Sequence, residues 1–260
     1  ERLLARFDTL PKEQRKALRD SVAIPEGEGT YWAFKTREQL IAAALNTGNK
    51  GNLDKMLRGE PGLNAQILDA ALANLTAEEW QLVQGIWDDI DLFWPQIEAM
   101  YTELKGAPPP RVKPVPMTVR ARNNAGEIVE MDLRGGYYPV KYDMRRDKSG
   151  RQHDLGDSLI ARMMDGNPTR NPKTANGYSN ARTVAAFPID LRLNVVAEHI
   201  AEVTHDLAFH QPLLAAHKII KDQRFRLAYS QRFSEEAYQQ LPHWLKDIAN
   251  DRIKPSGMSG

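Results

Sequence analysis

Apolar side chains recur every three or four positions over long stretches of the chain, which is the period of an amphipathic helix. The strongest run predicts one helix from Ala77 to Lys105, and its apolar positions are Trp80, Val83, Trp87, Ile90, Trp94, Ile97 and Tyr101. We expect this stripe to lie in the core, although the seven-residue spacing of its tryptophans would also suit a partner helix. Pro95 should kink the helix near Leu92, because proline lacks the backbone N–H that a helix interior requires.

Capping residues and prolines predict further helices on both sides of that run. Thr36 with Gln39, and Thr76 with Glu79, have the spacing of a capping box. The expected helices begin at Pro11, Thr36, Asn52, Leu63, Asp190, Pro212, Ser234 and Pro242, and those from Leu63 and Asp190 run to Leu75 and to about His210.

The period changes from helical to alternating after a proline-rich stretch. Residues 117–133 alternate as strands do around a turn sequence at 123–126, which predicts an antiparallel hairpin. The segment 135–143 is expected to be extended, either as a third strand or lying across the helices. A short helix is expected at 155–164, followed by an irregular segment rich in Asn, Gly, Pro and Thr at 165–183.

Together these features predict a mainly α (α+β) fold, a multi-helix domain with a small antiparallel β-hairpin insert and a long irregular loop. We divide the chain into an N-terminal helical part (1–107), the hairpin insert with the extended segment (108–156), and the loop with a C-terminal helical part (157–260). The two helical parts are expected to pack together as one domain. The missing initiator Met and the Ser-Gly end suggest a segment cut from a larger protein.

Composition excludes several classes of site. Hydrophobic residues make up 42% and charged residues 27% of the 260, which is ordinary for a globular protein. The 35 Lys and Arg nearly balance the 34 Asp and Glu, which argues against a dedicated nucleic-acid binder with a strongly basic face. A chain without cysteine has no disulfide, thiolate metal site or Cys nucleophile, and suits a reducing compartment. No apolar run approaches the roughly 18 residues of a membrane span.

One face of the expected C-terminal helix carries the side chains best suited to chemistry. His199, Asp206 and His210 fall within about 20° of one face at 100° per residue. Imidazoles and a carboxylate could hold a metal or pass protons, and His205-Asp206 is similar to the pair found in metal-dependent phosphohydrolases. The alternative is that these side chains bond to neighbouring helices. We therefore predict no metal or other cofactor, and name these three residues as catalytic candidates only.

A second candidate is the run Gly135, Gly136, Tyr137 and Tyr138. The glycines allow close backbone approach, and the tyrosines offer large apolar faces with a polar tip. A ligand or a nucleic-acid base could stack there. The alternative is a structural motif that fixes the extended segment onto the helices.

Positive charge gathers in the middle of the chain. Residues 106–175 hold thirteen Lys and Arg against eight Asp and Glu, whereas residues 1–105 hold twelve against seventeen. This asymmetry could steer nucleic acid or an acidic partner, or it could be a solvated surface. The nucleic-acid-binding candidates are Lys141, Arg145, Arg146, Lys148, Arg151, Arg170 and Arg182. The sequence carries no phosphate-binding loop, nucleophile elbow or zinc motif.

Four phrases resemble a conserved segment of very large polyvalent proteins of tailed bacteriophages and related mobile elements. They are Ala44-Leu-Asn-Thr-Gly-Asn49 with Asn52-Leu53, Thr76 to Trp87, Gly135 to Asp143, and His199 to Ala208. Such proteins are multidomain and are often packaged in the virion and delivered with the DNA. The resemblance implies a phage context and a long polypeptide, but it supplies no reaction.

We accordingly predict a non-catalytic structural or interaction domain of a large bacteriophage protein that is delivered with phage DNA or acts on it. The expected partners are other domains of the same polypeptide, virion proteins, and DNA or RNA through the local basic region. The expected location is the virion or the host cytoplasm. Two alternatives stay open, a metal-dependent hydrolase or nuclease on the His/Asp face and a nucleic-acid-binding module.

Overall fold

The computed structural model describes residues 2–27, 30–143, 146 and 187–249. These residues are mostly helical with two small two-stranded antiparallel sheets, so the predicted mainly α fold with a hairpin is confirmed. The helix expected at 155–164 and the irregular segment expected at 165–183 lie outside the described residues.

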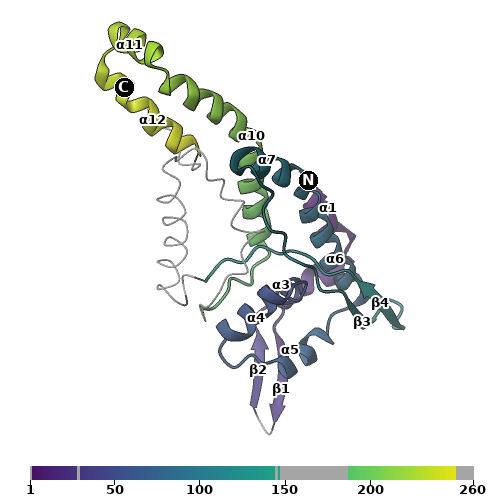
Figure 1. Ribbon diagram of the computed structural model, residues 1–260. Helices are drawn as coiled ribbons and strands as arrows, with labels where there is room; N and C mark the ends of the chain where they lie inside the picture. Colours follow the sequence, from purple (N-terminus) through teal and green to yellow (C-terminus); the bar gives the residue numbers. More distant parts are fainter. Residues whose placement is uncertain (1, 28–29, 144–145, 147–186, 250–260) are drawn as a thin grey trace. The chain divides into compact units, whose positions relative to one another are not determined.

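Most of the elements are labelled in Figure 1, where the colours follow the chain from purple to yellow. In chain order the elements are α1 (Arg2–Thr9), α2 (Lys12–Ala17), β1 (Val22–Gly27), β2 (Thr30–Phe34), α3 (Arg37–Asn46), α4 (Lys50–Gly59), α5 (Ala65–Leu72), α6 (Ala77–Asp91), α7 (Trp94–Lys105), β3 (Met117–Arg122), β4 (Ile128–Leu133), α10 (Asn194–Lys221), α11 (Gln223–Arg232) and α12 (Glu235–Ala249). None of the helices in the described ranges is long and apolar enough to cross a membrane.

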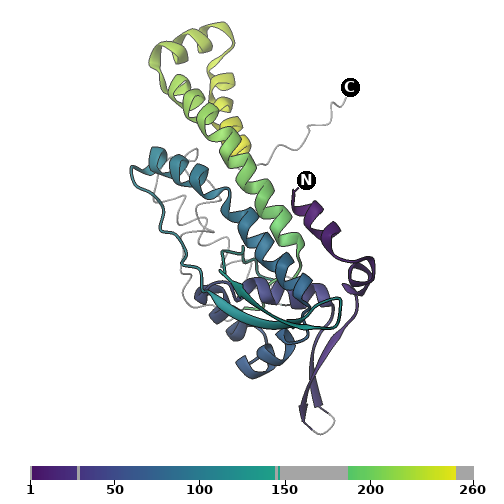
Figure 2. The same ribbon diagram turned by 90° about the vertical axis from the view of Figure 1, so that its right-hand side faces the viewer.

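The chain divides into two compact units. Unit 1 holds the described residues within 1–95, 110–154 and 177–200, and unit 2 holds those within 96–109 and 201–260. The core of unit 1 is built mainly by α3 and α6, where every residue from Leu40 to Leu45 is fully buried. Unit 2 contains the helical hairpin of α11 and α12, which lie side by side in both views (Figures 1 and 2).

The β1–β2 hairpin was not predicted. The apolar spacing predicts a helix through Val22 and a break at Pro25, but both residues belong to β1, which pairs antiparallel with β2 and sets Ile24 opposite Trp32. A two-stranded sheet has only edge strands, so Pro25 is tolerated because no second neighbour needs its missing N–H. Both views show this hairpin projecting from the helices of unit 1 (Figures 1 and 2).

The long tryptophan-bearing helix is two helices, because α6 ends at Asp91 and α7 begins at Trp94. The break lies at the predicted kink, and Pro95 occupies the first turn of α7, where a helix does not need its N–H. The capping box predicted at Thr76 is confirmed, with the Thr76 hydroxyl accepting from Glu79 N and the Glu79 carboxylate accepting from Thr76 N. At Thr36 only the hydroxyl half forms, because the Gln39 side chain accepts from Lys35 N instead. Six positions of the apolar stripe are buried as expected, namely Trp80, Val83, Trp87, Ile90, Trp94 and Ile97.

The predicted hairpin at 117–133 is confirmed. β3 and β4 pair in register from Met117 opposite Leu133 to Arg122 opposite Ile128, and Gly126 takes a φ of 86° in the turn between them. The extended segment after β4 adds no third strand to this sheet, and Tyr142 forms only an isolated bridge with Ile189.

The C-terminal helices differ from the prediction at two prolines. α10 runs without interruption from Asn194 to Lys221 although Pro212 lies inside it, and α12 likewise contains Pro242. Both prolines are exposed, so a carbonyl that loses its helical partner can bond to water. Asp190 does not cap α10; its carboxylate accepts from the backbone N–H of Arg192 instead.

Candidate functional site around Trp87

Trp87 of α6 lies where three segments distant in the sequence meet. Its side chain is 1% exposed, and its indole N–H donates to the Leu45 carbonyl, 3.0 Å away. A Cβ built on Gly48 would lie 2.5 Å from Trp87 Cε2, and one built on Gly136 would lie 2.5 Å from Trp87 Cγ. Side-chain carbons essentially never approach other atoms within 3.0 Å, so both positions require glycine.

The carbonyl oxygen of Gly48 joins the same segments through the backbone. It accepts hydrogen bonds from Val115 N at 2.9 Å and from Gly136 N at 3.0 Å. Gly135 has a φ of 71°, in the left-handed region that favours glycine, and a Cβ there would lie 2.8 Å from the same oxygen. The glycine pair therefore turns the chain leaving β4 onto the loop between α3 and α4.

Asparagine amides hold the segment that follows the glycine pair. Asn49 Nδ2 donates to the carbonyl of Gly136 at 3.2 Å, and Asn52 Nδ2 donates to the carbonyl of Tyr138 at 2.8 Å. The Asn49 side-chain oxygen accepts from Asn52 N, which caps α4. Both asparagines are buried, so these bonds satisfy carbonyls that water cannot reach.

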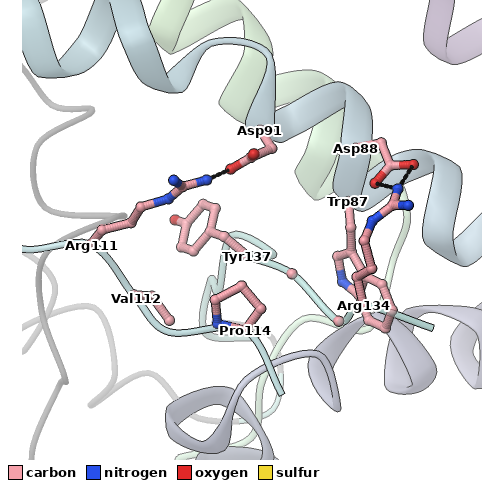
Figure 3. Close-up of a pocket in the computed structure, with 10 residues that line it drawn as sticks. Trp87, Asp88, Asp91, Arg111, Val112, Pro114, Arg134 and Tyr137 are labelled. Atoms are coloured by element: carbon pink, nitrogen blue, oxygen red, sulfur yellow. Dashed lines mark hydrogen bonds and ion pairs between the residues drawn. The ribbon is translucent and has the colours of Figure 1, made fainter. Parts of the chain in front are cut away.

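A surface cavity of about 140 Å³ opens beside this junction. Figure 3 shows an ion pair at each end of it, between Arg111 and Asp91 and between Arg134 and Asp88, with the ring of Tyr137 between them. Asp88 and Asp91 are one turn apart on α6, and Arg134 reaches both oxygens of Asp88 at 2.7 Å. Each carboxylate therefore fixes an arginine from a different incoming segment.

The two tyrosines of the Gly-Gly-Tyr-Tyr run have different environments. Tyr138 is 1% exposed, and burial raises the pKa of its hydroxyl, which donates to the Arg192 carbonyl at 3.4 Å. The ring of Tyr137 contacts the imidazole of His199, with centroids 5.6 Å apart. Burial, with a smaller contribution from Lys141, lowers the pKa of His199 to about 4. His199 is therefore neutral at pH 7 and contributes a packing surface.

The other two catalytic candidates lie in unit 2. Asp206 is buried and lies 3.5 Å from His205 Nδ1, and His210 Nε2 lies 3.6 Å from a carboxylate oxygen of Glu103. On a regular helix, the seven residues from His199 to Asp206 place their Cα atoms about 10.5 Å apart along the axis. The described residues contain no group of three or more His, Asp or Glu able to hold a metal ion.

Two of the seven nucleic-acid-binding candidates lie in the described part of the chain. Lys141 pairs with Glu198 at 2.7 Å, and Arg146 pairs with Glu60 at 2.7 Å. Glu60 is buried, and its desolvation raises the pKa of this carboxyl despite the arginine. The candidates outside the described residues are Arg145, Lys148, Arg151, Arg170 and Arg182.

Sequence reasoning missed the polar contacts that fix the extended segment. Lys55 of α4 is buried, and its ammonium donates to the hydroxyl of Tyr142 at 3.0 Å. The asparagines at 46, 49 and 52 recur every three residues, a spacing that places them near one another across the end of α3 and the start of α4. That spacing was the available signal, but it does not say which carbonyls the amides meet.

Comparison of the chain with protein-family models, with curated proteins and with solved structures found no match.

Proposed function

We propose that the chain is a non-catalytic structural and interaction domain of a large bacteriophage polypeptide that is delivered with phage DNA or acts on it. The phage context rests on the resemblance of the four phrases. The non-catalytic role rests on what their side chains do in unit 1.

One observation carries the proposal: the phrases of the resemblance meet at a single junction. Gly48 and Gly136 both lie against Trp87, and Tyr137 of the third phrase contacts His199 of the fourth. Three buried side chains here bond to the main chain, namely the Trp87 indole and the amides of Asn49 and Asn52. Side chains that bond to the main chain hold the segments together and are not available to a substrate. The residues of these phrases that meet at the junction are those that a scaffold would need.

The phage context is tested in purified particles of the phage or mobile element that encodes this chain. Antibodies raised against the chain should detect, in DNA-filled particles, a band well above the 29.4 kDa of these 260 residues. Absence of the antigen from particles and from infected cells during DNA entry would overturn the proposal. Turnover of a phosphoester by the purified chain, lost on replacing His210 with alanine, would also overturn it.

The scaffold role is tested by a pair of glycine substitutions in the same encoded polypeptide. Gly48→Val places a branched side chain against the Trp87 ring and should abolish incorporation of the polypeptide into particles. Gly51→Ala is the matched control, because a Cβ there meets only the Asn49 side-chain oxygen at 3.6 Å. Normal incorporation of the Gly48→Val polypeptide, with the purified domain unfolded, would contradict a structural role.

A further inference from the structure

The end of α10 and the whole of α11, in unit 2, form a compact basic segment. Residues 218–232 contain five Lys and Arg, at 218, 221, 224, 226 and 232, against the single acid Asp222, a net charge of +4. α11 has no buried residue, so its outer side chains can meet a ligand without rearrangement.

Most of these charges are not neutralised within the segment. Asp222 is occupied as the N-cap of α11, accepting from Arg224 N at 2.8 Å and Phe225 N at 3.0 Å. Arg226 pairs with Glu235 of α12 at 2.5 Å. The remaining cations are exposed and have no carboxylate within ion-pair distance among the described residues; they are Lys218, Lys221, Arg224 and Arg232.

An aromatic row runs along α11 and ends at Phe233. The ring of Tyr229 lies 5.5 Å from that of Phe225 and 4.7 Å from that of Phe233. Phe233 ends the row and is 63% exposed, with the guanidinium of Arg232 5.5 Å from its centroid. An exposed ring with a cation against it is an arrangement that binds stacked bases together with their phosphates.

We propose that this segment binds single-stranded nucleic acid, with Lys218, Lys221 and Arg224 contacting phosphates and Phe233 stacking on a base. The net charge of +4 over residues 218–232 complements a polyphosphate backbone. The exposed aromatic favours a single strand, because the bases of a duplex are already stacked on one another. The proposal concerns residues outside the basic region predicted from the sequence, and it does not depend on the phage context.

Fluorescence anisotropy of a labelled oligothymidylate of about 20 nucleotides, titrated with the full chain, tests the site. Binding should weaken steeply with salt. The triple substitution Lys218→Gln, Lys221→Gln and Arg224→Gln should lower affinity about 10-fold or more at low salt. It should also reduce the slope of log affinity against log salt by about 2, since each phosphate contact on a single strand contributes about 0.7. Phe233→Leu should lower affinity about 5-fold or more with the slope unchanged.

The matched control removes three exposed cations from unit 1, as Lys35→Gln, Lys50→Gln and Arg58→Gln. It should change affinity less than about 2-fold, because its charges lie outside the site. No binding at low salt, an equal loss in the control, or tighter binding of a duplex of the same length would overturn the proposal. Binding to anionic vesicles but not to the oligonucleotide would overturn it in favour of a membrane surface.

Circular dichroism should show unchanged helix content in each variant, because the replaced side chains are exposed. If the triple variant unfolds, the three single substitutions replace it, and each should reduce the salt slope by about 0.7. A salt slope unchanged in all three would overturn the assignment of phosphate contacts.

Discussion

Gly136 lies against Trp87 so closely that a Cβ on the glycine would come within 2.5 Å of Trp87 Cγ. Gly136→Ala should therefore lower the free energy of unfolding by about 1–3 kcal/mol, because the tryptophan must shift in a filled core. Urea denaturation measures this change. Gly51→Ala, in the first turn of α4, should be neutral or stabilise by up to about 1 kcal/mol. Equal destabilisation by the two substitutions would show that the contact with Trp87 is not the cause.

The amide of Asn52 is expected to be needed as a donor. Asn52→Asp keeps the shape but presents a carboxylate oxygen to the Tyr138 carbonyl, 2.8 Å from the present nitrogen. The free energy of unfolding should fall by about 2–4 kcal/mol, since a buried donor is lost and a charge is introduced. Asn74 makes the same kind of bond to the Ala70 carbonyl but is exposed, so Asn74→Asp should cost less than about 1 kcal/mol. Thermal melting of the two variants measures the difference in stability.

The ion pair between Arg37 and Glu79 joins α3 to α6 inside unit 1. The Glu79 side chain is fully buried, and Arg37 contacts both carboxylate oxygens, at 2.5 and 2.7 Å. Arg37→Ala should lower the free energy of unfolding by about 3–5 kcal/mol, because it leaves a buried carboxylate without its counter-charge. Arg15→Ala breaks an exposed pair with Asp8 and should cost less than about 1 kcal/mol.

A double substitution separates charge from packing at this pair. Arg37→Met together with Glu79→Gln removes both charges, so it should be less destabilising than Arg37→Ala alone. Chemical denaturation of the single and double variants gives the comparison. A larger loss of unfolding free energy in the double variant would show that lost packing, and not the uncompensated charge, dominates.

His199 should make stability depend on pH. Its pKa is about 4 in the folded protein against an ordinary value of 6.5, so the unfolded chain binds more protons between these values. The contribution of neutral His199 to the free energy of unfolding is fully present above about pH 6.5. It is lost as pH falls toward 4, on the order of 3 kcal/mol in total. In His199→Gln this part of the pH dependence should disappear, because the substitution removes the imidazole and leaves Lys141 and Glu198 in place.

The control for this pH effect is the exposed His243. His243→Gln makes the same exchange at an exposed position, and its pH profile of the free energy of unfolding is the reference for that of His199→Gln. Denaturation curves recorded between pH 4 and pH 8 provide the profiles. A profile of His199→Gln that parallels the unsubstituted protein would show that other groups produce the acid destabilisation.

Features encoded within a few residues could be predicted. The capping box of Thr76 and Glu79 and the burial of the tryptophan stripe need only local spacing, and both agree with the structure. The β3–β4 hairpin was likewise visible in its alternation and turn. The β1–β2 hairpin was missed because Pro25 is a local signal against a strand, and whether it is tolerated depends on how many neighbours the strand has.

The candidate site was only partly accessible from sequence. The Gly-Gly-Tyr-Tyr run was identified, but its contacts with Gly48 and Asn52 link positions more than 80 residues apart. Helical periodicity placed His199, Asp206 and His210 on one face, but it does not say how deeply each is buried or which residues of other segments lie against it. The charge count alone does not single out the basic segment at residues 218–232, because whether a cation is already paired depends on its neighbours in the fold.

The sequence by itself determined where most helices begin, which faces are apolar, and that no thiol chemistry is available. Those properties depend on backbone hydrogen bonding and on side chains a few positions apart. The tertiary structure decided that Trp87, Gly48 and Gly136 form one junction, and that Lys141 and Arg146 are ion-paired while Lys218, Lys221 and Arg224 lie exposed. Close packing and charge pairing act between atoms that touch, and only the folded chain decides which atoms do.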